Sequence, residues 1–238
     1  MNADSYLQVT DLCRYYRRGA QVVRALDGVT LTVNRGEFLS IVGSSGSGKT
    51  TLLNLMAGLD TPTGGSVVFD TSSLTSLSRR QLASYRAHKT GMIFQSFNLI
   101  PHYTALQNVE TALYFNATAP AERRRRASAT LDQLGLSDRK DHRPADLSGG
   151  EQQRVAVARA IVKGPEILFA DEPTGNLDFE NANQIASLLS MLNREGLTIV
   201  MVTHNLDMAQ SCSHRTIRMH YGRIITDSTS PIFGARPA

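Results

Sequence analysis

The sequence contains no tryptophan, only two cysteines and few aromatic residues, which make up 6% of its 238 positions. Cys13 and Cys212 lie far apart and outside any metal-ligand spacing, so we expect neither a disulfide framework nor a zinc site. No apolar run approaches the ~18 residues of a membrane span. Residues 1–11 lack the basic and apolar segments of a signal peptide. These absences favour a protein that is cytoplasmic, and soluble when alone.

The composition is otherwise that of an ordinary globular protein, with 41% hydrophobic and 19% charged residues. Its length suffices for one sizeable domain, alone or with a subdomain. The net charge is +4 and the isoelectric point about 9.3, which can indicate nucleic-acid or anionic-lipid partners. Part of this charge is local, because the run from Arg123 to Arg126 supplies four cations. For this run we favour a solvated helix face over a contact with lipid or a partner.

Strand-like and helix-like segments alternate in the first and last thirds of the chain, which predicts an α/β fold with a mainly parallel core sheet. The predicted strands are 7–16, 22–33, 37–42, 66–69, 166–170 and 197–202. The predicted helices are 49–56, 181–193 and a short one after 202, followed by a closing hairpin around Tyr221 and Gly222. The middle third is helical, with segments at 104–115, 121–135 and 151–162.

We therefore expect a single domain over residues 1–238. Residues 1–95 and 161–238 would form its core, and about 96–160 an inserted helical subdomain.

Residues 43–50 read GSSGSGKT, which matches the phosphate-loop pattern between a predicted strand and a predicted helix. The glycines permit a tight turn whose N–H groups form an anion nest, and the helix N-terminus adds its dipole. Lys49 brings a charge to the β- and γ-phosphates, and Thr50 offers a hydroxyl to Mg²⁺. The expected nucleotide-binding set is Gly43, Ser44, Ser45, Gly46, Ser47, Gly48, Lys49, Thr50 and Thr51.

Two carboxylates follow a later apolar strand, in the segment EILFADE at 166–172. Asp171 is expected to hold Mg²⁺ as the partner of Thr50. Glu172 would then lie beside the γ-phosphate, where it can orient or deprotonate a water molecule. A strand that ends in Asp-Glu is commonplace alone, but combined with the phosphate loop it predicts a P-loop nucleotide hydrolase.

A second glycine motif, LSGGEQQR, lies at residues 147–154. Ser148 can cap a helix there, and Gly149 and Gly150 leave backbone N–H groups exposed. One nucleotide has no evident use for two anion sites from separate subdomains. We therefore expect this second site to serve a nucleotide bound to another copy of the chain.

With these motifs, the sequence resembles the nucleotide-binding subunits of ABC transporters, from residue 7 to about 225. Further motifs in the expected order are Tyr16 before the first hairpin, Gln95 in MIFQSFN, the GNLD segment that ends at Asp178, and His204 in VTHN. The resemblance implies the P-loop ABC ATPase fold. In that fold, a mainly parallel core carries an N-terminal antiparallel β subdomain and an inserted α-helical subdomain.

The resemblance also implies a role for each of these residues. Tyr16 would stack on adenine, with Tyr15 as the alternative; for either tyrosine, a half-buried strand position is the competing interpretation. Gln95 would reach Mg²⁺ and the attacking water. His204 would contact the γ-phosphate and steady Glu172. The expected catalytic residues are Glu172, His204, Gln95 and Lys49, and the expected metal ligands are Thr50, Gln95 and Asp171.

A homodimer with ATP at its interface is a further implication of the resemblance. Asp178 would approach the facing phosphate loop, and Ser148, Gly149 and Gly150 would bind the γ-phosphate held by the opposite subunit. Glu151 stands where many relatives carry glutamine. Such a chain acts with an integral-membrane permease subunit, as a peripheral protein on the cytoplasmic face of the inner (plasma) membrane.

Branch-level motifs favour one group within the family. QSFNLIP followed by TALQNVE, together with ADEPTGNLD, is similar to the macrolide-efflux and lipoprotein-release branch. We therefore predict an ATPase that powers export or extraction of a lipoprotein, peptide or drug through a separate permease. SGGEQQRVAVARA also resembles the bacterial cell-division ATPase, which makes a septal membrane complex the alternative.

Two other classes are disfavoured. ABC-type ATPases that act on nucleic acid or ribosomes usually carry two cassettes or an extra module, so we expect no nucleic-acid partner. A non-hydrolysing scaffold would have damaged catalytic positions, whereas Lys49, Gln95, Glu172 and His204 are all present.

Overall fold

The computed structural model describes residues 5–19, 21–116 and 118–229. The two ends of the predicted domain, 1–4 and 230–238, lie outside the described residues. The strands are β1 (Ser5–Arg18), β2 (Gln21–Asn34), β3 (Phe38–Val42), β4 (Gly64–Phe69), β5 (Ser72–Ser73), β6 (Thr90–Ile93), β7 (Ile167–Asp171), β8 (Thr198–Thr203), β9 (Arg215–His220) and β10 (Arg223–Thr229). The helices are α1 (Lys49–Met56), α2 (Arg79–His88), α3 (Ala105–Glu110), α4 (Pro120–Gln133), α5 (Gly149–Ile161), α6 (Phe179–Arg194) and α7 (Leu206–Cys212). Short 3₁₀ turns are η1 (Leu74–Ser76), η2 (Thr111–Asn116), η3 (Ser137–Arg139) and η4 (Pro144–Asp146).

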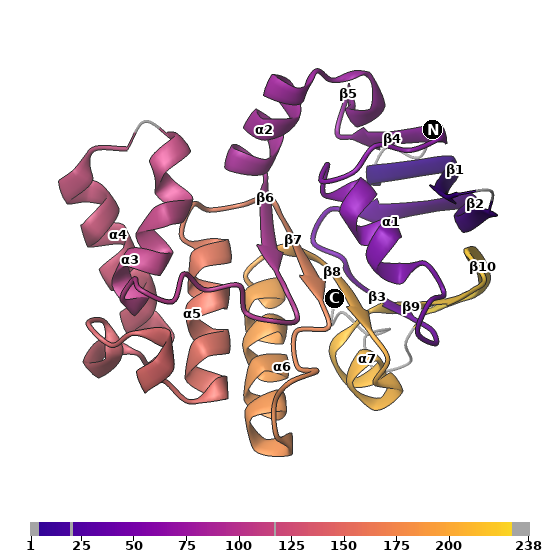
Figure 1. The fold of residues 1–238 in the computed structure, drawn as a ribbon. Helices are drawn as coiled ribbons and strands as arrows, with labels where there is room; N and C mark the ends of the chain where they lie inside the picture. Colours follow the sequence, from indigo (N-terminus) through magenta and orange to yellow (C-terminus); the bar gives the residue numbers. More distant parts are fainter. Residues whose placement is uncertain (1–4, 20, 117, 230–238) are drawn as a thin grey trace, which may run out of the picture.

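Two sheets organise the molecule. A six-stranded sheet has the order β10-β9-β3-β8-β7-β6, in which all pairs are parallel except β10 with β9. A four-stranded antiparallel sheet has the order β2-β1-β4-β5. Figure 1 shows the antiparallel sheet at one end of the molecule, while α3, α4 and α5 lie together at the other end. The chain therefore has the mainly parallel core sheet, the separate antiparallel sheet and the group of helices that the sequence predicted.

The parallel strands are short and apolar because both faces of their sheet are covered. In β8, Val200 and Val202 face the hydrophobic cluster formed with α1 and the antiparallel sheet. The alternate residues Ile199 and Met201 face a second cluster, formed with α3 to α7. All four side chains are fully buried. This double burial fixes the carboxyl ends of the strands, which carry the candidate site.

The loop that leads into α3 is tied down by a buried amide. Asn108 is fully buried, and its Nδ2 donates to the carbonyl oxygens of Ile100, Tyr103 and Thr104 at 3.0–3.3 Å. Its Oδ1 accepts the N–H of Ile100 at 2.7 Å. Thr104 also caps α3 through a capping box with Gln107. Segment 100–104 is therefore attached to the first turns of α3.

Most predicted elements are confirmed to within a few residues, and α1 has the predicted bounds. The closing hairpin turns at Tyr221 and Gly222, and Cys13 and Cys212 are free thiols. The predicted helix 104–115 is wrong in its second half, where the chain continues as the 3₁₀ turn η2. Among the described residues, the structure contains no helix with both the length and the apolarity of a membrane span.

The sequence did not predict α2, β5 or β6. In α2, RRQLASYRAH buries one side chain, Tyr85, so it has no apolar stripe to recognise. Its start is instead fixed by Ser78, whose hydroxyl forms a capping box with Gln81. Strand β6 is only four residues long, and β5 only two.

Candidate functional site

The phosphate loop joins β3 to α1. Gly48 is the N-cap of α1 with φ 100°, and no side chain caps this helix end. A Cβ at Gly48 would overlap the carbonyl oxygen of Ala25, so the close approach of β2 requires glycine there. The ammonium of Lys49 donates to the carbonyls of Gly43 and Ser44 at 2.8 and 3.1 Å. The first-turn N–H groups of α1 thus remain free to bind an anion.

A hollow of about 670 Å³ opens above this loop. It lies at the carboxyl ends of the parallel strands, the edge where open α/β sheets bind ligands. The lining residues are Val23, Arg24, Ala25, Ser45, Gly46, Ser47, Gly48, Lys49, Thr50, Thr51, Gln95, Glu172 and His204. Every predicted catalytic residue therefore borders one cavity, although the four come from four separate parts of the chain.

Two oxygens suited to a divalent cation meet at the edge of this hollow. Thr50 Oγ1 donates to Asp171 Oδ1 at 3.0 Å. The pKa of Asp171 is raised, chiefly by burial, whereas the bond from Thr50 acts in the opposite direction. A hydroxyl beside a carboxylate is the kind of oxygen pair that Mg²⁺ uses together with substrate phosphates, so these residues fit the ion.

The second carboxylate, Glu172, is held in an unusual backbone conformation. Its φ is 46°, in the left-handed region that non-glycine residues seldom adopt. Its N–H donates to the carbonyl of Val202 at 2.9 Å. Its Oε2 accepts the backbone N–H of His204 at 3.2 Å and lies 3.0 Å from Nδ1 of the same residue. The Glu172 side chain is 13% exposed, whereas His204 is 67% exposed and open to a ligand.

The loop that carries Gln95 accepts hydrogen bonds from two other parts of the chain. Phe97 and Asn98 are consecutive left-handed residues, with φ 56° and 51°. The guanidinium of Arg159, on α5, donates to their carbonyl oxygens at 2.7 and 2.5 Å. Asn176 donates from its amide to the carbonyl of Gln95 at 2.9 Å. The sequence did not predict a role for Arg159 or Asn176, although Arg159 lies in SGGEQQRVAVARA and Asn176 in GNLD.

The LSGGEQQR motif starts α5 with a complete capping box. Ser148 Oγ accepts the N–H of Glu151 at 3.2 Å, and Glu151 Oε2 accepts the N–H of Ser148 at 2.7 Å. Glu151 Oε1 accepts from Arg139 Nε at 2.8 Å. These bonds, led by that from Arg139, lower the pKa of Glu151 to about 2. Ser148, Gly149 and Gly150 are not among the residues that line the hollow.

The starts of α5 and α6 lie side by side. Asp178 caps α6, where its carboxylate accepts the backbone N–H of Asn181 at 2.8 Å and the amide of the same residue at 2.7 Å. A Cβ at Gly150 would overlap the Asn181 side chain, so α5 begins in contact with α6 only because residue 150 is glycine. The structure thus brings together the two segments that we expect to face another copy of the chain.

Neither candidate adenine-stacking tyrosine lines the hollow. The Tyr16 hydroxyl donates to Asp60 at 2.8 Å, and the guanidinium of Arg14 lies 4.5 Å from the centre of its ring. The Tyr15 hydroxyl donates to Asp27 at 2.7 Å. The side of the hollow towards the antiparallel sheet is lined by residues 23–25 of β2 instead.

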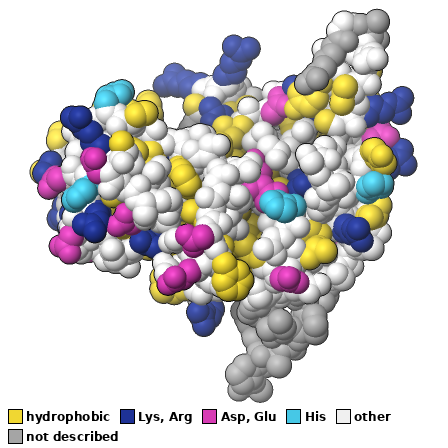
Figure 2. All heavy atoms as spheres, turned by 60° about the horizontal axis from the view of Figure 1, so that its bottom comes forward, with side chains coloured by type: hydrophobic (Ala, Val, Ile, Leu, Met, Phe, Trp, Pro, Cys, Tyr) yellow, Lys and Arg dark blue, Asp and Glu magenta, His cyan; other side chains and the backbone are white. Residues whose placement is uncertain are grey.

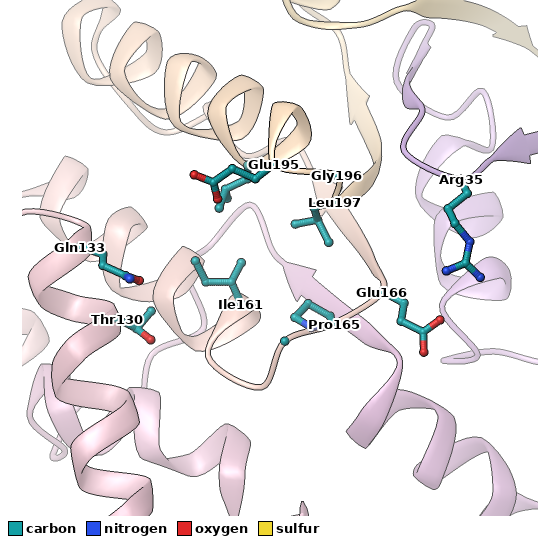
Figure 3. A pocket seen from close by; sticks show the side chains of 11 residues that line it. Arg35, Thr130, Gln133, Ile161, Pro165, Glu166, Glu195, Gly196 and Leu197 are labelled. Atoms are coloured by element: carbon teal, nitrogen blue, oxygen red, sulfur yellow. The ribbon is translucent and has the colours of Figure 1, made fainter.

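A second hollow, of about 450 Å³, lies at the opposite edge of the sheet, because its lining residues Glu166 and Leu197 precede β7 and β8. Figure 3 shows Arg35 and Glu166 on one side of it, and Gln133 and Glu195 on the other. Glu166 already accepts bonds from Tyr6 and Lys89. The hollow at the carboxyl edge is therefore the candidate site.

Figure 2 shows the molecule turned so that the bottom of Figure 1 comes towards the viewer. Basic and acidic side chains are interspersed over its helical lobe, and a histidine lies against acidic side chains near its middle. Charge on this face is therefore mixed, in contrast to the single-sign surface that binds a nucleic-acid backbone.

Comparison with known families shows which family the chain belongs to. The sequence profile described as "ABC transporter" matches residues 26–175, more than half of the chain. The chain belongs to the ABC transporter family. This ABC cassette is 44% identical, over 94% of its length, to the macrolide export ATP-binding/permease protein MacB of Brucella melitensis biotype 1. It is 43% identical over the same share to the protein of that name from Brucella abortus. The cassette spans about a third of the length of these curated relatives, 34% in both cases.

Solved structures of similar cassettes agree with this assignment. The cassette matches the dimeric structure of a post-hydrolysis state of the ATP-binding cassette MJ0796 bound to ADP and Pi, with a TM-score of 0.87. The two are 40% identical, over 94% of this chain and 98% of that one. A second dimeric structure of MJ0796, a bacterial ABC transporter cassette, is 41% identical with the same TM-score. The chain is thus an ABC ATPase cassette, similar to the cassettes of macrolide export ATP-binding/permease proteins and to MJ0796. Cassettes of this fold bind ATP, and the homologues imply ATP hydrolysis.

Proposed function

We propose that this chain hydrolyses Mg-ATP to power export or extraction of a lipoprotein, peptide or drug through a membrane permease. The convergence of Lys49, Gln95, Glu172 and His204 on one hollow beside the phosphate loop is the observation that carries the proposal. This arrangement combines a phosphate cradle, a carboxylate base and polar groups around the position of the γ-phosphate.

The proposed chemistry follows from the residues around the hollow. The loop N–H groups and Lys49 bind the phosphates. Thr50, Asp171 and Gln95 would hold Mg²⁺, which would neutralise part of the phosphate charge. Glu172 accepts a proton from the attacking water, and the strained backbone and the two bonds to His204 fix its carboxylate for this step. The His204 ring is mostly exposed, so its second nitrogen, Nε2, can contact the γ-phosphate while Nδ1 keeps its bond to Glu172.

We further propose that two copies of the chain close on two ATP molecules. The N–H groups of Gly149 and Gly150 lie outside the capping box of α5, so they can donate to a γ-phosphate held by the other copy. Asp178 adjoins them through the contact of Gly150 with Asn181. Hydrolysis breaks the bond between the β- and γ-phosphates. The phosphate loop of one copy and the α5 N-terminus of the other then no longer hold one molecule, which weakens the interface. The MJ0796 cassettes, whose structures are dimeric, support this arrangement.

Coupling to the membrane is proposed through the loop that bears Gln95. We propose that residues 96–160 act as a helical unit against a core of 1–95 and 161–238, and that the permease engages the groove beside Gln95. The macrolide export ATP-binding/permease proteins support a permease partner, and with it a peripheral position on the cytoplasmic face of the inner (plasma) membrane.

Glu172→Gln is the variant that tests this proposal. It keeps the shape of the side chain but removes the base, so turnover should fall at least ~100-fold while ATP binding and the ATP-dependent dimer persist. Glu195→Gln, at the opposite edge of the sheet, is the matched control and should hydrolyse ATP like the parent protein. If Glu172→Gln keeps the parental rate, the assignment of the base is wrong.

The partner is tested by recovery of tagged Glu172→Gln from native membranes with Mg-ATP, followed by mass spectrometry. A permease with a large extracytoplasmic domain supports export or extraction. A septal division protein moves the function to the division complex. Salt-sensitive recovery of ribosomes or nucleic acid, without any membrane protein, contradicts the transporter proposal.

A further inference from the structure

The start of α5 contains a carboxylate at the position where an anion is expected to bind. Glu151 lies in the first turn, and its Oε2 is 2.7 Å from the backbone nitrogen of Ser148. By contrast, the first turn of α1, at the phosphate loop, contains no acidic residue. An uncompensated carboxylate at a helix end repels a phosphate that approaches the same N–H groups.

Arg139 offsets this charge. Its Nε donates to Glu151 Oε1 at 2.8 Å, and the bond leaves the Glu151 side chain 19% exposed and that of Arg139 44% exposed. Two other cations of neighbouring segments are engaged elsewhere, since Lys140 pairs with Asp132 and Arg154 donates to Gln184. Arg139 lies on η3, twelve residues before Glu151, so its position depends on the connection between α4 and α5.

We infer that Arg139 is a positioning residue that neutralises Glu151, so that the N-terminus of α5 accepts the γ-phosphate of ATP held by a second copy of this chain. The inference rests on the proposed function, because it deepens the role proposed for Ser148, Gly149 and Gly150. In this arrangement Glu151 maintains the cap of the free subunit, and Arg139 keeps that cap from excluding the phosphate.

The experiment measures ATP-dependent dimerisation by analytical ultracentrifugation in the Glu172→Gln background with Mg-ATP. Arg139→Ala should weaken the dimer roughly tenfold, because it exposes the Glu151 charge to the phosphate. Glu151→Gln should dimerise within about twofold of the parent, because glutamine at this position preserves the capping box. The double variant Arg139→Ala/Glu151→Gln should regain the parental dimer. Arg125→Ala, which removes a comparable exposed ion pair on α4, is the matched control.

Two further measurements separate this role from a structural one. Binding of ATP to the monomer should be unchanged in every variant, since the phosphate loop is intact. Arg139→Ala and Glu151→Gln should lower the melting temperature alike, because both break the same ion pair. If Glu151→Gln weakens the dimer as much as Arg139→Ala does, and the double variant does not recover, the pair is only structural and the inference fails. If the Glu172→Gln parent itself does not dimerise with ATP, the proposed dimer fails, and this inference with it.

Discussion

The two helices that begin at glycine motifs, α1 and α5, have N-termini of opposite construction. Helix α1 starts at a left-handed glycine, without a side-chain cap or an acidic first-turn residue. Helix α5 starts at Ser148 with a full capping box, and Glu151 in that box is paired with Arg139. The first N-terminus is open to phosphate in a single chain. At the second N-terminus, the capping box already satisfies some of the backbone N–H groups. This suits a site that a phosphate reaches only when another subunit closes on it.

The largest effect is expected at the open N-terminus, from Gly48→Ala. A Cβ there overlaps the carbonyl of Ala25 at a φ of 100°, so the loop must distort. ATP affinity should fall at least ~100-fold, the equivalent of about 3 kcal/mol of strain. Gly46→Ala is the comparison, because its φ is 78° but no atom lies within 4 Å of the added carbon. It should lose only about fivefold, as measured by titration calorimetry, and equal losses would show that packing against β2 is unimportant.

The corresponding change at the capped N-terminus is Gly150→Ala. The added methyl group overlaps Asn181, which also bonds Asp178, so both expected dimer-facing segments shift. Dimerisation with ATP should weaken by roughly 30-fold, while ATP binding to the monomer is kept. Gly149→Ala should have a much smaller effect, since its nearest neighbour, Leu177, lies at an ordinary 3.5 Å. Recovery of the dimer in Gly150→Ala/Asn181→Ala would show that the overlap is the cause.

A smaller effect is expected at Arg159. This α5 residue donates to the loop that carries Gln95, which borders the hollow above the phosphate loop. Arg159→Ala removes the donors to two left-handed residues, so the Gln95 loop should relax. We expect kcat for ATP to fall about tenfold with little change in KM, as measured by steady-state phosphate release. Arg159→Lys should recover part of the rate, because an ammonium can reach one of the two carbonyls. A proportional rise in KM would contradict a role limited to the Gln95 loop.

The smallest effect concerns stability and pH. The pKa of Glu151 falls from an ordinary 4.5 to about 2 in the fold, so its ion pair stabilises the folded state fully above 4.5. That contribution is lost as the pH falls towards 2. Because Arg139 is partly exposed, Glu151→Gln should cost only about 1 kcal/mol at neutral pH. Urea unfolding at pH 7, 5 and 3 should show the difference between variant and parent shrinking between pH 5 and 3, and a difference that grows would reverse the assigned sign.

Local signals made the open N-terminus predictable from sequence. The pattern at 43–50 specifies a turn and the start of a helix within eight residues, and the adjoining apolar strands are equally local. The capped N-terminus was predicted only in part. Ser148 is a recognisable cap, but the pairing of Glu151 with Arg139 depends on how η3 folds back, which no short motif encodes.

Long-range contacts account for the rest. Arg159 lies 61 positions from Asn98, and its bond exists only because α5 packs beside the Gln95 loop. Helix α2 escaped prediction because it is polar on nearly every side, and it is fixed by Tyr85, whose hydroxyl donates to the carbonyl of Met56. The adenine-stacking role of Tyr16 was predicted from its position before a hairpin. In the structure, strand alternation and the bond from its hydroxyl to Asp60 determine where its ring lies.

The buried amide of Asn108 has a mechanical consequence. Its four bonds join segment 100–104 to α3, so a displacement of that segment cannot be absorbed by bending the loop. We therefore expect a load applied there to move the first turns of α3 together with the segment. Asn108 thereby gives this stretch of irregular backbone a fixed attachment to a regular element.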